Sequence, residues 1–334
     1  MDSSENIYVC GFTNSYGAGG QDIALIKYNN LGERQWNITW GGINNDSARA
    51  IALDSSNNIY ITGYYDATWG SKGDMILLKY DNSGQLQWNA TWGGSDFERG
   101  NAIALDNSEN IYIAGQTSSF GAGAEDMVLV KYNNLGQQQW NTTWGGITYD
   151  SIFSIVVDSS DNIYATGITT SFGAGSLDFA IWKYNNLGQL QWFSPWGGSG
   201  YEHAWAIALD SSDNLYICGH TSSFGAGGTE IAFVKYDSLG QQQWNTTWGG
   251  VSEDRGENVV VDSSENIYIM GTTRSFGAGG NDMVLIKYSE SSGEIIPGYD
   301  LFLLIGSICV ISTIIIKKHH NQQSLKKKVL KLNK

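Results

Sequence analysis

Proline, histidine and cysteine are all scarce in this chain of 334 residues, which has 2 Pro, 4 His and 3 Cys. With so little proline, its 42 glycines favour short strands joined by tight turns over a disordered chain. The cysteines form no disulfide framework, because Cys10 and Cys218 occupy equivalent positions of a sequence repeat and Cys309 lies in an apolar run. Equivalent positions of separate repeat units lie too far apart to bond. We therefore expect free thiols.

Basic residues are also scarce outside the C-terminal tail. Seven lysines lie between Lys317 and the end, which leaves 12 basic and 33 acidic residues, or a net charge of -21, in the rest of the chain. An acidic body repels a phosphate backbone, so the composition excludes nucleic acid as a partner. A charged fraction of only 16% is more typical of a β-rich protein than of a helical one.

A repeat of 52 residues runs through the sequence without one insertion. Its clearest landmark is an aspartate that opens a phrase such as DSSENIY. This aspartate occurs at Asp2, Asp54, Asp106, Asp158, Asp210 and Asp262. A Lys-Tyr pair and a Trp-x-x-x-Trp-Gly-Gly motif recur with the same step. Periods of this size indicate a propeller or another repeat architecture.

One repeat unit contains four strand-like runs, at 50–54, 58–63, 74–80 and 85–92, bounded by Gly, Asn, Asp or Ser. Four antiparallel strands in about 50 residues make one propeller blade, and stacked blades bury both faces of each sheet. In the last run Trp88 and Trp92 share one face, which suits packing between blades. A linear β-solenoid is the competing architecture. No helical period precedes residue 300.

We therefore predict an all-β fold over residues 1–290, a β-propeller of six four-stranded blades. The chain opens at the second strand of a unit and stops after the third, so the first and last blades are expected to be incomplete. Met1 stands directly before the first repeat, and we expect the natural N-terminus to lie further upstream.

The repeat motifs read D-x-x-x-N-I-Y-x-x-G, S-F-G-A-G-x-x-D, K-Y-x-x-x-G and W-x-x-x-W-G-G. Over residues 2 to about 290 they resemble the SBBP-type β-propeller repeat family. The fourth copy departs from the pattern at 192–198, which reads WFSPWGG. The resemblance implies a bacterial or archaeal surface or secreted protein, and it specifies no chemistry.

The C-terminal region differs from the repeats. Residues 291–300 are expected to be a linker, 301–316 an uncharged transmembrane helix of about 24 Å, and 317–334 a basic cytoplasmic tail. The lysines that follow the apolar run place the propeller outside the cell. The stretch from Pro297 through the lysines resembles archaeal C-terminal sorting signals of the PGF-CTERM kind, with Tyr299 in place of Phe. A permanent membrane anchor and a cleaved signal both remain open, as does a buried core helix.

Two sets of acidic residues recur on what should be one face of the propeller. The set that precedes the first strand of each unit consists of Asp46, Glu98, Asp150, Glu202 and Asp254. The set that opens the third strand consists of Asp22, Asp74, Asp126, Asp178, Glu230 and Asp282. Together they predict an acidic ligand-binding ring that could hold a divalent cation or a cationic ligand. Alternatively, these side chains cap turns through local hydrogen bonds. No other cofactor is expected.

The symmetry of the repeats breaks in the fifth unit, which carries the only histidines outside the tail. His203 precedes a first strand and His220 follows a second strand, while Glu202 and Glu230 belong to the same face. These four residues form a candidate metal or acid–base site. The alternative is a pair of ordinary histidines, since the spacing matches no known metal signature.

Asn-x-Ser/Thr sequons recur in the fourth strand of the units. They stand at Asn37, Asn89, Asn141 and Asn245. An outermost edge strand is a plausible glycosylation site, and plain polar edge residues are the alternative.

The near-identical units favour a membrane-anchored, cell-surface binding or adhesion module over an enzyme. The expected partners are an extracellular glycan or protein and the membrane. An extracellular lyase or hydrolase with a site on the acidic face, and a purely structural envelope protein, are the alternatives.

Overall fold

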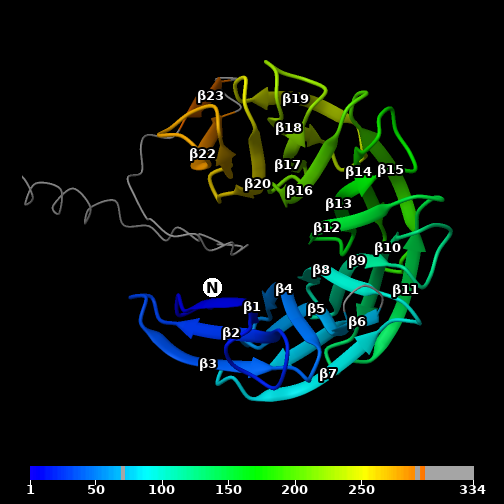
Figure 1. Ribbon diagram of the computed structural model, residues 1–334, viewed down its shortest axis with the longest axis vertical. Coiled ribbons are helices and arrows are strands. Elements are labelled where there is room, and N and C mark those ends of the chain that lie inside the picture. Colours follow the sequence, from blue (N-terminus) through cyan, green and yellow to red (C-terminus); the bar gives the residue numbers. More distant parts are fainter. Residues whose placement is uncertain (69–71, 290–293, 298–334) are drawn as a thin grey trace, which may run out of the picture.

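The computed structural model describes residues 1–68, 72–289 and 294–297, and these residues form strands, turns and loops without any helix. Their 23 strands make six antiparallel sheets, which Figure 1 shows arranged around a common centre. The expected all-β, propeller-like fold is confirmed.

Each sheet contains strands that are consecutive in the chain, and we number the sheets 1 to 6 in chain order. Sheet 1 has three strands and the others have four. The strands are, in sheet 1, β1 (Ile7–Thr13), β2 (Asp22–Tyr28) and β3 (Arg34–Trp40); in sheet 2, β4 (Asn45–Leu53), β5 (Ile59–Thr68), β6 (Lys72–Tyr80) and β7 (Leu86–Trp92); in sheet 3, β8 (Glu98–Leu105), β9 (Ile111–Thr117), β10 (Asp126–Tyr132) and β11 (Gln138–Trp144); in sheet 4, β12 (Asp150–Val157), β13 (Ile163–Thr169), β14 (Asp178–Tyr184) and β15 (Leu190–Trp196); in sheet 5, β16 (Glu202–Leu209), β17 (Leu215–Thr221), β18 (Glu230–Tyr236) and β19 (Gln242–Trp248); and in sheet 6, β20 (Asp254–Val261), β21 (Ile267–Thr273), β22 (Asp282–Ser289) and β23 (Glu294–Pro297).

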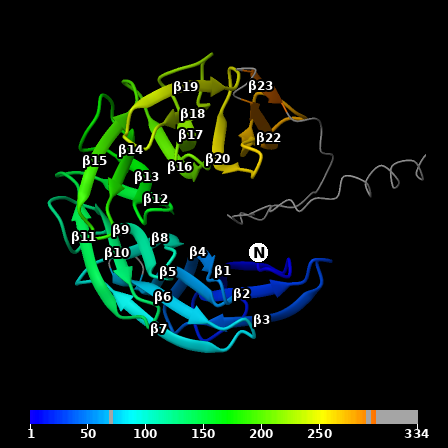
Figure 2. The same cartoon turned by 180° about the vertical axis from the view of Figure 1, so that it is seen from behind.

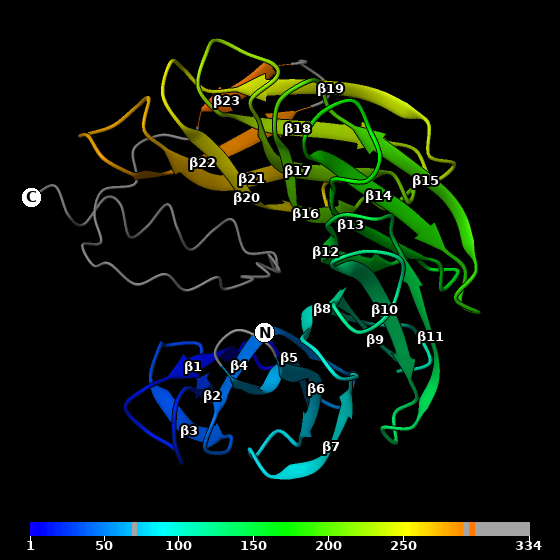
Figure 3. The same cartoon turned by 45° about the vertical axis from the view of Figure 1, so that its right-hand side comes forward.

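The first strand of each four-stranded sheet lies nearest the centre of the ring and the last lies at its rim. Figure 2 shows β7, β11, β15 and β19 along the outside and β4, β8, β12 and β16 on the inside. Sheet 1 has no inner strand, and no described strand of sheet 1 pairs with one of sheet 6 (Figure 3).

The expected end of the last blade needs a correction. Its fourth strand is present as β23, which pairs with β22. The pairing runs from Ser289 opposite Glu294 to Ile286 opposite Pro297. This short strand lies inside the segment 291–300 that the sequence suggested as a linker.

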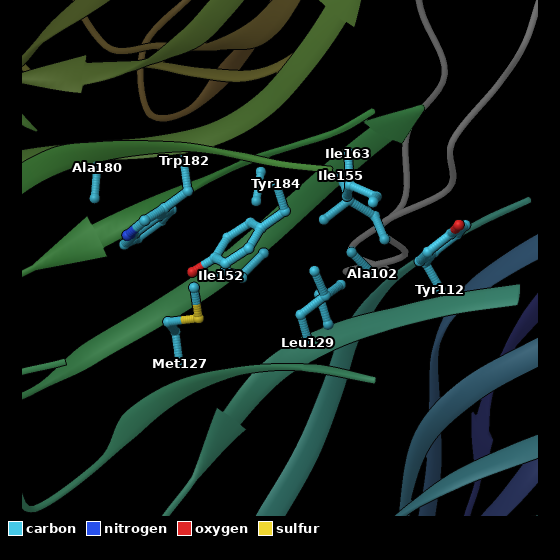
Figure 4. Close-up of a cluster of buried hydrophobic side chains, with 12 residues drawn as sticks. Ala102, Tyr112, Met127, Leu129, Ile152, Ile155, Ile163, Ala180, Trp182 and Tyr184 are labelled. Carbon is cyan, nitrogen blue, oxygen red and sulfur yellow. The ribbon is translucent and has the colours of Figure 1, made fainter. Parts of the chain in front are cut away.

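Hydrophobic side chains fill the space between neighbouring sheets. The two middle strands of sheets 3, 4 and 5 are buried along almost their whole length, because another sheet covers each of their faces. In Figure 4, Met127 and Leu129 of sheet 3 meet Trp182 and Tyr184 of sheet 4. Each of these four side chains is almost fully buried.

The paired tryptophans pack between sheets, as predicted. The second tryptophan of a unit contacts the aromatic ring of the next sheet's Gly-rich loop, as in Trp144 and Phe172, whose ring centroids are 4.7 Å apart. The first tryptophan lies against the last turn of the next sheet, where Trp140 Nε1 donates to the carbonyl of Asn186 at 3.2 Å.

The recurring turn aspartate joins several elements at once. Asp106 accepts hydrogen bonds from the backbone N–H groups of Ser108 and Asn110, both at 2.9 Å, from the Asn110 amide at 2.8 Å and from the Tyr112 hydroxyl at 3.0 Å. Lys131 lies 3.7 Å from the same carboxylate. Lys131 also donates to a carbonyl of the next sheet at 3.4 Å, so this group links sheets as well as the strands within one.

Two further expectations concern the cysteines and the tail. Cys10 and Cys218 are free thiols, as predicted. The apolar segment 301–316 and the basic tail 317–334 lie outside the described residues. Within the described part of the chain, no helix is long and apolar enough to span a membrane.

Candidate functional site

The acidic ring expected in front of the inner strands is not exposed. Asp46, Glu98, Asp150, Glu202 and Asp254 are all fully buried. Glu98 is representative: it accepts from the N–H groups of Gly94 at 2.8 Å and Ser119 at 3.0 Å, and from the Thr117 hydroxyl at 2.8 Å. Because their oxygens accept hydrogen bonds from strand ends and adjoining loops, these carboxylates hold the loops in place and form no exposed ligand-binding surface.

The inner strands carry one position that differs in every sheet. Each has a β-bulge that leaves one residue without a partner in β-strand register. These bulged residues are Arg49, Asn101, Phe153, Trp205 and Glu257. None of the five is fully buried. Bulges commonly redirect a side chain next to a functional site, and here the same bulge presents five different side chains.

Four side chains from two neighbouring sheets form the one aromatic cluster that includes histidine within the described residues. Phe153 on β12 lies 4.8 Å from His203 and 5.0 Å from Trp205, both on β16, measured between ring centroids. His203 stacks on Trp205 at 4.0 Å and on His220 of β17 at 5.4 Å. We call Phe153, His203, Trp205 and His220 the inner-strand cluster.

The inner-strand cluster is uncharged at neutral pH and has hydrogen-bonding atoms to spare. Burial, helped by the proximity of His220, lowers the pKa of His203 to about 3. Burial, helped by Arg255, lowers the pKa of His220 to about 4. The Nδ1 atoms of both imidazoles and Nε1 of Trp205 have no hydrogen-bond partner. Buried polar atoms of this kind usually find a partner, so their grouping marks a place where a ligand can bind.

The border of the cluster is charged. Arg255 occupies in sheet 6 the position that His203 has in sheet 5, and it forms an ion pair with Glu253. Arg274 lies 2.8 Å from the same Glu253 carboxylate. The two arginines are exposed and Glu253 is half-buried, and these charges adjoin an aromatic surface that carries no charge of its own.

The four residues suggested as a metal site do not come together. His203 and His220 are direct cross-strand neighbours, but Glu202 is adjacent to His203 and therefore points to the opposite face of the sheet. Glu202 accepts from the Thr221 hydroxyl and from Gly198 N–H, and Glu230 accepts from the N–H groups of its own loop. Within the described ranges, no cluster of three or more His, Cys, Asp or Glu side chains converges as a metal site.

The four sequon asparagines lie on the outer strands β3, β7, β11 and β19, and all four side chains are exposed. Their neighbours on the opposite face are the half-buried tryptophans. The positions are accessible, and glycosylation itself stays a prediction.

Sequence reasoning identified His203 and His220 but missed their contacts with Phe153 and Trp205. A signal was present, because Phe153 and Trp205 are 52 residues apart and therefore occupy the same position in successive sheets. Comparing the repeats column by column would have placed both large aromatic residues at one variable position.

No family model matches the chain. It is 22% identical over 306 residues to an uncharacterized WD repeat-containing protein of Acanthamoeba polyphaga mimivirus, covering 79% of this chain and 18% of that protein. It is 26% identical over 170 residues to the regulatory protein FlaEY of Caulobacter vibrioides, covering 43% of this chain and 18% of that protein. The chain thus spans less than a fifth of the length of these two relatives.

Solved structures show the same architecture. PorZ, a bacterial surface component of the type-IX secretion system of Porphyromonas gingivalis, aligns with a TM-score of 0.52 at 15% identity, over 89% of this chain and 40% of PorZ. The propeller domain of the Trilobed protease of Pyrococcus furiosus, described as having an open velcro topology, aligns at 0.50 and 11% identity, over 89% and 80%. The chain is a β-propeller repeat protein. An ulvan lyase aligns at 0.55 and 14% identity, over 89% of this chain and 81% of the lyase. At such identities these likenesses show the fold alone.

Proposed function

We propose that this β-propeller is a carbohydrate-binding module that takes an uncharged sugar ring at the inner-strand cluster. The observation that carries the proposal is the break in repeat symmetry, which places Phe153, His203, Trp205 and His220 side by side on the inner strands of sheets 4 and 5. Elsewhere the repeats conserve the residues that hold the sheets together. At the bulge of the inner strands, the residue differs from one sheet to the next.

The chemistry of the inner-strand cluster suits a sugar. A pyranose ring has an apolar face that stacks on an aromatic ring and a rim of hydroxyls that need donors and acceptors. Trp205 and Phe153 supply the flat apolar surface. Trp205 Nε1 is a donor, and each neutral imidazole offers one donor and one acceptor. A ligand that must pair with a cation inside the cluster would find none, because both histidines are neutral at pH 7.

The wider proposal concerns where this module acts. We infer a six-bladed propeller of the SBBP type, held at a cell surface by residues 301–316 with the basic tail inside the cell. Support comes from the repeat motifs and from the uncharged run followed by lysines. Fractionation of cells that express the full chain, with and without residues 296–334, tests the anchor. Recovery of the full, uncleaved chain without detergent would contradict it.

Ligand binding is tested with the full chain in detergent on an array of neutral and acidic oligosaccharides. We expect binding to neutral members. Trp205→Ala and Phe153→Ala should each weaken affinity at least about tenfold, which corresponds to about 1.4 kcal/mol of lost stacking.

Two matched controls separate the cluster from its surroundings. Arg49→Ala changes the equivalent bulge on β4, and Phe172→Ala removes a partly exposed phenyl ring from a loop. Both should bind within about twofold of the parent. Equal losses in the controls, or binding confined to acidic members, would contradict the proposed site. Release of shortened products from a bound oligosaccharide would favour the alternative of an extracellular lyase or hydrolase.

A further inference from the structure

Each junction between consecutive sheets contains two carboxylates. One opens the third strand of a sheet, and the other opens the inner strand of the next sheet. At the junction of sheets 3 and 4 the pair is Asp126 with Asp150. At the junction of sheets 4 and 5 it is Asp178 with Glu202. All four residues are at most 1% exposed. We call these the junction pairs.

One oxygen of each junction pair lacks a partner. Asp126 Oδ2 accepts from the N–H of Gly123 at 3.0 Å, and Asp178 Oδ2 accepts from that of Gly175 at 3.0 Å. Their Oδ1 atoms are buried without any hydrogen-bond partner. The facing acid is well satisfied, since Asp150 accepts from the N–H of Gly146 at 2.8 Å and from hydroxyl groups. Burying a carboxylate oxygen without a compensating contact is costly, so the unpartnered atoms call for a ligand.

The unpartnered oxygen faces the other acid of its pair across a glycine. A Cβ placed on Gly197 would lie 2.2 Å from Asp178 Oδ1 and 2.4 Å from Glu202 Oε2. The two oxygens are therefore separated by no more than the sum of those distances, about 4.6 Å. At Gly145 the corresponding distances to Asp126 Oδ1 and Asp150 Oδ2 are 2.0 and 2.8 Å. Any side chain at these positions would clash with both oxygens, so glycine is required for the two carboxylates to approach each other.

We propose that the junction pairs Asp126–Asp150 and Asp178–Glu202 each bind a calcium ion that links one sheet to the next. An ion with oxygen bonds of about 2.3 to 2.6 Å reaches both carboxylates of a pair. The donor set contains carboxylate oxygens and neither imidazole nor thiolate, which favours a hard cation over zinc. Two carboxylates leave most of the coordination shell to backbone carbonyls and water, an arrangement that calcium accepts through its flexible geometry.

The two acids of the pair Asp178–Glu202 disfavour each other's charge. Burial is the main cause that raises the pKa of Asp178; hydrogen bonds from the N–H groups of Gly175 and Ala174 oppose the rise, and the neighbouring Glu202 adds to it. The alternative way to relieve two buried like charges is one shared proton within the pair. A divalent ion relieves the same repulsion and also uses the unpartnered oxygen. If calcium is bound, an asparagine substitution should remove one bound ion. If the pair shares a proton, the parent binds no calcium and the substitution removes none.

The test measures calcium binding and unfolding temperature of the full chain in detergent. The protein is stripped with a chelator and dialysed at pH 7.5 against radioactive calcium, and its unfolding midpoint is recorded with and without calcium. Asp126→Asn, Asp178→Asn and the double variant are compared with Asp161→Asn. Asp161 is a turn residue with a φ of 60°, a conformation that asparagine also adopts readily.

We expect at least two calcium ions in the parent and in Asp161→Asn, about one fewer in each single variant, and about two fewer in the double variant. Calcium should raise the unfolding midpoint of the parent, and the double variant should lose that rise. Asparagine mimics a protonated aspartate, so the variants should remain folded in chelator. Absence of stoichiometric calcium in the parent, or unchanged binding in the double variant, would overturn the proposal and leave the shared proton as the explanation.

Discussion

The turn aspartate Asp106 and the junction pairs are both repeated, both acidic and both buried, yet the hydrogen bonding of their oxygens differs. Asp106 has every oxygen occupied by donors from its own turn and from Tyr112. Burial alone would raise its pKa, but those hydrogen bonds outweigh burial and lower it. At Asp178 one oxygen is unpartnered, and burial outweighs the two backbone hydrogen bonds to the carboxylate and raises its pKa. Repetition therefore does not distinguish a structural carboxylate from a binding one. The two kinds of carboxylate are distinguished by whether each oxygen has a hydrogen-bond partner.

The largest effect should come from removing a turn aspartate. Asp106→Ala leaves the Tyr112 hydroxyl and the Asn110 amide without an acceptor, and we expect it to lower the free energy of unfolding by about 3 kcal/mol. Chemical denaturation of parent and variant measures this loss. Glu257→Ala, at an exposed bulge of β20, is the control and should change stability by less than about 0.5 kcal/mol. A loss at Asp106 no larger than that of the control would show that the turn is not held by its carboxylate.

The histidines of the inner-strand cluster should make stability depend on pH between about 6.5 and 4. Their folded-state pKa values, about 3 and about 4, lie below the ordinary value of 6.5. The unfolded chain therefore takes up protons first, and stability that is fully present above pH 6.5 is lost as the pH falls. The loss is at most about 1.4 kcal/mol per pH unit and per histidine.

Denaturation midpoints of the parent and of His203→Asn with His220→Asn, measured every half pH unit, check this dependence. The double variant should show a flatter profile in this range. Parallel profiles would mean that the two imidazoles titrate normally.

The two kinds of carboxylate should respond oppositely to acid in chelator. Because its folded pKa is lowered, Asp106 contributes stability above its ordinary pKa that disappears as the pH falls through the folded value. Asp178 has a raised pKa, so its charged form destabilises the fold as the pH rises through that value. We expect Asp178→Asn to stabilise the calcium-free protein at pH 7 by about 1 kcal/mol.

The matched change at the turn is Asp106→Asn, which should destabilise at the same pH. Thermal unfolding in chelator at pH 7 compares the two variants. A shift of the same sign in both would remove the distinction between turn and junction carboxylates.

The smallest effect should come from the rim. Asn141→Gln on β11 changes an exposed side chain and should alter stability by less than about 0.5 kcal/mol. Intact-mass measurement of parent and variant from a glycosylating host tests the sequon. A mass difference beyond that of the substitution itself shows a glycan on Asn141, and no such difference contradicts the sequon prediction.

Much of the fold was predictable because the 52-residue repeat multiplies each local signal. The strand runs, their turns and the tryptophans between sheets all follow from one unit read six times. The site was harder to predict. The burial of Glu202 depends on the Thr221 hydroxyl, 19 residues away, and on the N–H of Gly198. Both residues occupy repeated positions, but the repeat does not show that the fold brings them to the carboxylate. Phe153 and Trp205 meet only because a bulge turns both toward the same junction. The strand β23 was missed because its four residues carry none of the tryptophan pattern of the other outer strands.

The ring has a mechanical consequence. Sheets 1 and 6 share no hydrogen-bonded strand among the described residues, so we expect the six sheets to act as rigid plates joined by five hinges in series. A pull that separates the first plate from the last passes through every hinge, and a small rotation at each adds to a large opening at the free ends. The compliance of the whole is then governed by its softest hinge. The calcium ions proposed between sheets 3 and 4 and between sheets 4 and 5 would stiffen two of these hinges, and removing them would let the two halves of the ring rotate more freely against each other.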